Sequence, residues 1–119
     1  MFTLEIISGP QGSGKSLKLK EKLSAVGGTL LSMSEIKSLI QFVDEDPNLM
    51  NTNIFEVVDS LSKYKTIGVD EVFEKSNFEI LELFSDKMNV IVATQRTEKE
   101  IESFGIEKVM KLHSCYVRL

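Results

Sequence analysis

The sequence predicts one three-layer α/β domain built on a mainly parallel sheet of about five strands. Short apolar runs rich in β-branched residues alternate with segments whose apolar residues recur at helical spacing. Strands that alternate with helices form parallel sheets with right-handed crossovers, and helices cover both faces of such sheets. Neither an internal repeat nor a linker divides the 119 residues, so we expect residues 1–119 to form a single domain.

The first part of the chain predicts a strand, a helix and a second strand. Residues 3–8 form a buried strand, residues 16–26 form a helix that ends at Gly27, and residues 29–32 form a short strand. Three apolar residues fall on one face of this helix, namely Leu19, Leu23 and Val26.

Two helices are predicted in the middle of the chain. Ser32 and Glu35 have the spacing of a capping box at the start of the first helix. Its apolar residues recur at helical spacing and are Ile36, Leu39, Ile40 and Val43. A polar loop over residues 44–53 separates it from the second helix. The apolar residues of that second helix are Ile54, Val57, Val58 and Leu61.

The second half predicts three strands and two further helices. The strands cover residues 66–70, 89–94 and 113–118. A capping box of Ser76 with Glu79 opens the first of the two helices. Thr97, followed three residues later by Glu100, caps the second helix, which ends at Gly105.

A glycine-rich segment directly after the first strand has the pattern of a phosphate-binding loop. It reads Gly9-Pro10-Gln11-Gly12-Ser13-Gly14-Lys15-Ser16 and fits G-x-x-x-x-G-K-[ST] in full. Glycines let consecutive backbone N–H groups point at phosphate oxygens, and the following helix N-terminus favours negative charge. Lys15 can reach the β- and γ-phosphates, and the Ser16 hydroxyl can bind Mg²⁺. We therefore expect residues 9–16 together with Leu17 to bind the nucleotide.

The context of this loop argues against one alternative and leaves another open. A chance glycine-rich turn is disfavoured because the loop follows a strand and opens a helix. A loop that binds nucleotide without hydrolysing it remains possible on the sequence, since a motif does not prove turnover.

Two adjacent carboxylates, Asp70 and Glu71, end the strand at residues 66–70. An acidic residue at such a strand end can hold Mg²⁺, usually through a water molecule, and we assign this role to Asp70. The next carboxylate can orient and deprotonate the attacking water, so Glu71 is the expected general base. Glu74 lies beyond the strand end and is the poorer candidate. The alternative is a solvated acidic turn.

Polar residues also end the strand at residues 89–94. A polar side chain here can bond both the attacking water and a γ-phosphate oxygen, and we favour Gln95, with Thr94 second. The alternative is simple entry into the helix capped by Thr97. Only two arginines occur, Arg96 and Arg118. Arg96 is the better candidate to neutralise charge during phosphoryl transfer, with an ion pair to the acidic residues that follow as its alternative.

The remaining features limit the function classes. A net charge of −4 argues against a domain that coats DNA non-specifically. Lys18 and Lys22 could touch a phosphate backbone, although a solvated helix face is the simpler interpretation. The single Cys115 and single His113 cannot form a zinc cluster, so we read both as structural. No apolar run suggests a membrane span or a signal peptide. A single cysteine cannot form an internal disulfide, so we expect a bacterial or host cytoplasm.

The ordered set of phosphate loop, Asp70-Glu71 strand and polar strand end resembles the P-loop ATPase division that has an additional central strand and a catalytic glutamate. That resemblance implies the strand order 5-1-4-3-2. The segment Val90-Ile91-Val92-Ala93-Thr94-Gln95-Arg96 looks like the FtsK–HerA group of DNA-pumping and packaging ATPases, which includes phage assembly proteins of the zonula occludens toxin type. These two resemblances imply that the chain binds ATP and Mg²⁺. They also imply a role in DNA translocation, packaging or replication in a phage or mobile-element context. The partners they imply are further copies in a homo-oligomeric ring or a partner protein.

A second resemblance is to thymidine kinase, through Gly9-Pro10, the Gly-Lys-Ser triplet and the Asp70-Glu71 strand end. The chain lacks that family's four-cysteine zinc site and has little length for a lid over a nucleoside. A small nucleoside or nucleotide kinase and a non-hydrolysing regulatory module are therefore the alternatives to an ATPase.

Overall fold

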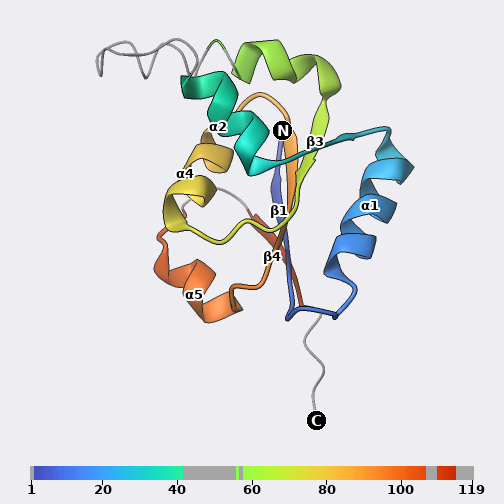
Figure 1. Cartoon of the computed structure of the whole chain (residues 1–119), viewed down its shortest axis with the longest axis vertical. Helices are drawn as coiled ribbons and strands as arrows, with labels where there is room; N and C mark the ends of the chain where they lie inside the picture. Colours follow the sequence, from blue (N-terminus) through green and yellow to red (C-terminus); the bar gives the residue numbers. More distant parts are fainter. Residues whose placement is uncertain (1, 42–55, 57, 107–109, 115–119) are drawn as a thin grey trace.

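The computed structural model describes residues 2–41, 56, 58–106 and 110–114. Five strands alternate with helices along the chain (Figure 1). The elements are β1 (Leu4–Ser8), α1 (Lys15–Val26), β2 (Thr29–Leu31), α2 (Met33–Gln41), the short 3-10 helix η1 (Ser62–Tyr64), β3 (Thr66–Val69), α4 (Lys75–Phe84), β4 (Asn89–Thr94), α5 (Glu98–Ser103) and β5 (Met110–Ser114). Residue 56 and residues 58–61 are also helical and lead into η1.

The sheet has the order β2-β3-β4-β1-β5, and every neighbouring pair is parallel. Read from the opposite edge, this is the order 5-1-4-3-2 that the resemblance implied. β1 and β4 lie at the centre, and both are buried for most of their length. Their continuous apolar sequences follow from this position, because a strand covered on both faces needs apolar side chains on both.

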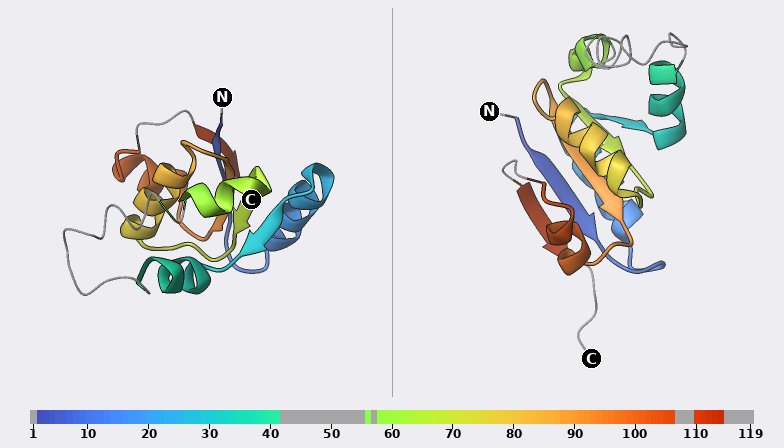
Figure 2. Two further views of the ribbon diagram at one scale, coloured as in Figure 1. Left: turned by 90° about the horizontal axis from the view of Figure 1, so that it is seen from above. Right: turned by 90° about the vertical axis from the view of Figure 1, so that its left-hand side faces the viewer.

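Helices cover both faces of the sheet. α1 lies on one face, and α2, α4 and α5 lie on the other (Figure 1); the view from above in Figure 2 shows the same division. Alternate residues of β1 therefore contribute to two cores. Leu4 and Ile6 pack with the larger helix layer, whereas Ile7 packs with Leu19 and Leu23 of α1. The expected three-layer α/β arrangement agrees with this division.

Of the predicted capping boxes, the one at Thr97 is complete, and the one at Ser32 has the bond from the helix backbone to its N-cap side chain. Ser32 Oγ accepts a hydrogen bond from Glu35 N at 3.1 Å and donates to Glu35 Oε1 at 3.2 Å. Thr97 and Glu100 form both bonds of the box at the start of α5. These local pairs satisfy backbone N–H groups that the first turn of a helix leaves unpaired.

The predicted start of α4 was wrong. The helix begins at Lys75 with Glu74 as its N-cap, and no side chain caps it. The backbone N–H groups of Asn77 and Phe78 both donate to Glu74 O. This earlier start brings Asn77 and Phe78 inward, where both are buried. Burial of the Phe78 ring therefore outweighs the local capping pattern of Ser76.

Three further expectations need correction. Val26 is 60% exposed, because it is the last residue of α1 and the left-handed Gly27 then turns the chain back. Leu39 is also exposed, so the buried stripe of α2 is narrower than its spacing suggested. β5 starts at Met110 rather than His113, because its register with β1 pairs Leu4 with Met110. The loop at residues 44–53, Cys115 and Arg118 lie outside the described residues.

Within the described part of the chain, no helix is both long and apolar enough to cross a membrane.

Candidate phosphate-binding and hydrolytic site

The three predicted site segments follow neighbouring strands of the sheet. The phosphate loop follows β1, residues 94–96 end or follow β4, and Asp70-Glu71 follow β3, so the order β3-β4-β1 makes them adjacent. In the register, Ser8 pairs with Thr94 and Val69 with Val92. The three segments therefore share the carboxyl edge of the sheet, where parallel α/β sheets bind ligands.

Two backbone hydrogen bonds extend the contacts beyond the strands themselves. Gly9 N donates to Thr94 O at 3.1 Å, and Val72 N donates to Ala93 O at 3.1 Å. The start of the phosphate loop and the segment after the carboxylates are thus both fixed to the end of β4.

The backbone of the phosphate loop has the conformation that its glycines allow. Gly12 and Gly14 have φ values of 80° and 85°, in the left-handed region that side-chain-bearing residues rarely adopt. Ser13 N donates to Pro10 O at 3.1 Å and closes a turn. Gly14 is the N-cap of α1 and has no side chain to bond the first turn. The first backbone N–H groups of α1 are therefore available to an anion.

The polar side chains of the loop are placed close to this helix start. Lys15 is only 5% exposed, and its Nζ lies 3.4 Å from Pro10 O, the acceptor of its only short contact among the described residues. Ser13 Oγ is buried and makes no hydrogen bond within the described structure. Ser16 is half-buried, and the Leu17 side chain is exposed, so only the Leu17 backbone could serve a phosphate.

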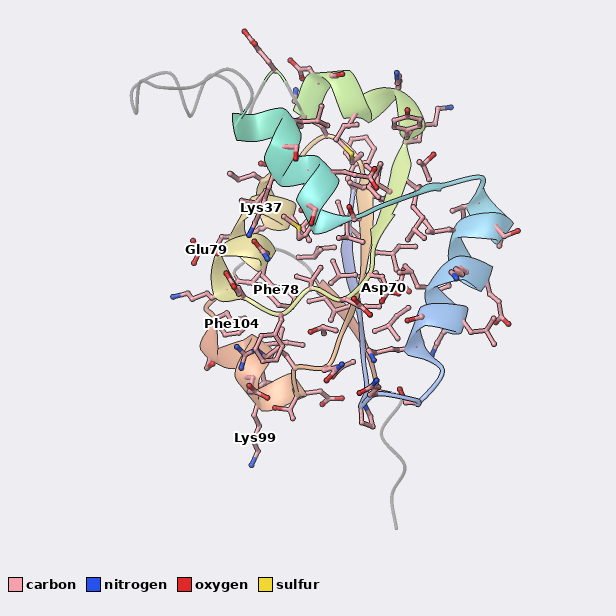
Figure 3. The ribbon with its side chains drawn as sticks, in the orientation of Figure 1. Lys37, Asp70, Phe78, Glu79, Lys99 and Phe104 are labelled. Atoms are coloured by element: carbon pink, nitrogen blue, oxygen red, sulfur yellow. The ribbon has the colours of Figure 1, made fainter. Side chains whose placement is uncertain are left out.

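The carboxylate pair sits on a strained turn. Asp70 is half-buried and its Oδ1 accepts a hydrogen bond from Glu71 N at 2.9 Å; Figure 3 shows Asp70 where the chain leaves β3. Glu71 is exposed and has φ of 56°, although it is not a glycine. Such a conformation costs free energy and occurs preferentially where function needs a defined side-chain direction.

At the end of β4, Thr94 and Gln95 have different surroundings. Thr94 is fully buried, and its Oγ1 accepts a hydrogen bond from Arg96 N at 3.0 Å, so this hydroxyl serves the local turn. Gln95 is exposed and lines an open cleft of about 280 Å³ together with Glu71, Val72 and Phe73. Gln95 and Glu71, the expected sensor and base, therefore border one cleft.

Arg96 has the ion pair that the sequence left as an alternative. Its guanidinium pairs with Glu100, with Nη1 2.5 Å from Oε2, and its Nε donates to Phe73 O at 2.8 Å. The centre of the guanidinium lies 3.7 Å from the centroid of the Phe73 ring. Bonds from the Thr97 backbone and then from Arg96 hold the pKa of Glu100 below its ordinary value of 4.5.

Sequence reasoning missed the parts played by Phe73 and Ser8. Ser8 Oγ donates to the backbone carbonyl of Arg96, a contact that joins the end of β1 to the segment between β4 and α5. No local pattern indicates either contact, because the partners are 23 and 88 residues apart in the chain. Lys22, predicted as part of a basic face, instead pairs with Glu5 at 2.7 Å.

No group of three or more His, Cys, Asp or Glu side chains suited to a metal ion occurs among the described residues. A Mg²⁺ ion that arrives with a nucleotide needs fewer protein ligands, because phosphate oxygens and water complete its shell. Ser16 and Asp70 offer the hard oxygen donors that Mg²⁺ prefers.

A scan of the chain against models of protein families finds no match, and a search of curated proteins finds none either.

Proposed function

We propose that this chain binds a nucleoside triphosphate with Mg²⁺ at residues 9–16 and hydrolyses its terminal phosphate. The observation that carries the proposal is the adjacency of three segments, the phosphate loop, Asp70-Glu71 and Thr94-Gln95, at one edge of a parallel sheet. A phosphate-binding loop alone supports binding, whereas a carboxylate and an amide bordering one cleft beside it support hydrolysis.

The donor set of the loop fits a polyphosphate. The first-turn N–H groups of α1, the Lys15 ammonium and the Ser13 hydroxyl, which has no partner among the described residues, are all hydrogen-bond donors within residues 13–17. The weak 3.4 Å contact of Lys15 with Pro10 O is easily exchanged for a charged phosphate oxygen. Ser16 and Asp70 would hold Mg²⁺, which supplies neutralisation of charge on the phosphates.

In the proposed reaction, the Glu71 carboxylate takes a proton from a water molecule that Gln95 helps to orient. The water oxygen attacks the γ-phosphorus, and the bond from this phosphorus to the β–γ bridging oxygen breaks. The products are a nucleoside diphosphate and inorganic phosphate. Lys15 and the backbone N–H groups stabilise the negative charge that shifts to the bridging oxygen.

The P-loop ATPase division with a catalytic glutamate accounts for the strand order and for the place of each segment, and on that basis we infer ATP as the nucleotide. By the same resemblance we propose a role in DNA handling (translocation, packaging or replication) in a phage or mobile element. The protein would then work in the cytoplasm, as a ring of copies or with a partner protein.

The decisive experiment measures phosphate release from ATP with Mg²⁺ by the wild type and by Glu71→Gln, with and without single- and double-stranded DNA, alongside a nucleotide-binding titration. We expect Glu71→Gln to lower turnover by about 10²-fold or more while binding persists. Glu74→Gln is the matched control, because Glu74 is an exposed carboxylate in the same loop whose side chain caps nothing.

Each arm of this experiment has a defined meaning. Turnover that DNA accelerates supports the DNA-handling role, and DNA-independent turnover contradicts it. Binding without phosphate release under every condition contradicts hydrolysis and leaves a regulatory module. Transfer of phosphate to an added nucleoside, rather than to water, identifies a kinase instead.

A further inference from the structure

Arg96 is bonded to the end of β1, to the end of β4 and to the loop that follows β3, which lie next to or within the three segments of the proposed site. Its backbone carbonyl accepts from Ser8 Oγ at the end of β1, and its backbone N–H donates to Thr94 Oγ1 at the end of β4. Its side-chain Nε donates to Phe73 O, two residues after Glu71. One residue therefore connects the strand before the phosphate loop, the sensor strand and the loop that carries the general base.

The far end of the Arg96 side chain is held by a carboxylate that is itself fixed. Glu100 Oε1 accepts from Thr97 N and Thr97 Oγ1, each at 3.1 Å, and Glu100 Oε2 accepts from Arg96 Nη1. The capping box of α5 thus sets the direction of the Glu100 carboxylate. Because Glu100 cannot turn without breaking the box, the guanidinium is held as well.

The guanidinium in turn restrains the loop after β3. It stacks on the Phe73 ring and bonds the Phe73 carbonyl, so it contacts this residue at both side chain and backbone. With the bond from Val72 N to Ala93 O, two successive residues of the loop are anchored directly after Glu71. The anchors explain how an exposed turn keeps Glu71 in a left-handed conformation.

We propose that Arg96 is a positioning residue that holds the Glu71 loop in place for hydrolysis, and not an arginine that contacts the transferred phosphate. This inference rests on the proposed function, in which Glu71 is the general base. An arginine that contacts the transferred phosphate needs free N–H donors directed at the γ-phosphate. In Arg96, Nε bonds Phe73 O, Nη1 bonds Glu100, and the guanidinium stacks on the Phe73 ring.

The first test compares the turnover of Arg96→Ala, Glu100→Ala and the double variant. A misplaced base lowers kcat by about 10²-fold while the affinity for nucleotide is unchanged. Because Glu100 acts on the loop through Arg96, the double variant should be no slower than Arg96→Ala alone. Arg96→Lys should not restore the rate, since an ammonium cannot bond Phe73 O and Glu100 and stack at once. Additive losses overturn the proposal.

The surface pair Lys75–Glu79 provides the matched control. It is also an i,i+4 pair, it opens the neighbouring helix α4, and its atoms are 3.9 Å apart with both side chains 57% exposed. Lys75→Ala and Glu79→Ala should leave kcat unchanged. Lys99→Ala tests α5 itself, since Figure 3 shows Lys99 extending away from the molecule.

A mixing experiment separates positioning within one chain from action on a neighbour. Arg96→Ala has an intact Glu71, and Glu71→Gln has an intact Arg96. If Arg96 served the site of an adjacent copy, a mixture of the two variants would regain turnover. A positioning role within the same chain predicts no gain, and regained turnover would overturn it.

A readout that does not depend on activity uses Phe73→Trp. The chain contains no tryptophan, so this exposed position becomes a single fluorescent reporter on the loop. Adding Arg96→Ala should lower the fluorescence anisotropy and increase quenching by acrylamide, whereas adding Lys75→Ala should change neither. An unchanged signal overturns the restraint itself. If the wild type hydrolyses no nucleotide while this signal does change, the proposed function fails and the restraint stands.

Discussion

The side chain of Leu23 lies so close to Gly68 that a Cβ placed on Gly68 would be 2.3 Å from Leu23 Cδ1. Leu23 belongs to α1 and Gly68 to the middle of β3, so the helix that begins at the phosphate loop rests directly on the strand that leads to the carboxylates. A glycine inside a strand commonly marks such a close approach. This contact sets how near α1 can lie to β3.

Gly68→Ala should therefore lower the free energy of unfolding by about 1–3 kcal/mol, because the added methyl group overpacks a filled core. Chemical denaturation measures the change. Leu23→Ala alone should cost about 2–5 kcal/mol through the cavity it leaves. Its cost should be smaller in the Gly68→Ala background, where the new methyl group occupies part of that cavity. Independent, additive costs would show that the two side chains do not meet.

Gly14→Ala should abolish nucleotide binding, because its φ of 85° is needed for the loop to present its N–H groups. The substitution should also destabilise the fold by about 1–2 kcal/mol, the cost of a left-handed non-glycine residue. Gly105→Ala is the matched control. It has φ of 71°, and neither glycine has an atom within 4 Å of an added Cβ. Gly105→Ala should lose a similar amount of stability but still bind nucleotide, as a nucleotide titration would show. Equal loss of binding in both variants would contradict the assignment.

Glu71→Gly and Glu71→Ala should both eliminate turnover, yet differ in stability. Glycine adopts φ of 56° without the steric cost that alanine keeps, so the glycine variant should be more stable by about 1 kcal/mol. Lys65, with φ of 61°, is the other non-glycine residue of positive φ among the described residues. Lys65→Gly should likewise be more stable than Lys65→Ala, with turnover unaffected. Denaturation curves and phosphate release together check both.

Glu100 should stabilise the fold at neutral pH and lose that effect in acid. Its pKa is lowered in the folded state, first by the Thr97 backbone N–H and then by Arg96. Such a group contributes stability above its unfolded pKa and loses it as the pH falls through the folded value. The Tm of the wild type should therefore exceed that of Glu100→Gln at pH 7, and the gap should shrink by pH 3.

Glu98→Gln serves as the control for this titration. Glu98 is in the same first turn but forms no ion pair or side-chain hydrogen bond among the residues that the structure describes. Its Tm difference from the wild type should stay nearly constant between the two pH values. A constant gap for Glu100→Gln as well would show that its bonds add no stability.

Many limits of the strands and helices could be predicted from the local sequence, because local interactions determine them. The limits of β4 follow from its continuous apolar run, and the box at Thr97 follows from two side chains three residues apart. The same spacing at Ser76 predicted the wrong start for α4, because burial of Phe78 begins the helix earlier. The contact of Arg96 with Phe73 could not be predicted, because it depends on two loops that only the completed sheet brings together.

The pairing of β1 has a consequence for how the protein emerges during synthesis. β1 is made first, but its two neighbours are β4 and β5, and Thr3 N reaches Asn89 Oδ1, 86 residues further along the chain. Pairings between such distant segments form slowly. The nascent chain must hold an apolar strand unpaired until β4 leaves the ribosome. Because the bond from Gly9 N to Thr94 O can close only then, a polypeptide cut short before Thr94 should have no capacity to bind nucleotide.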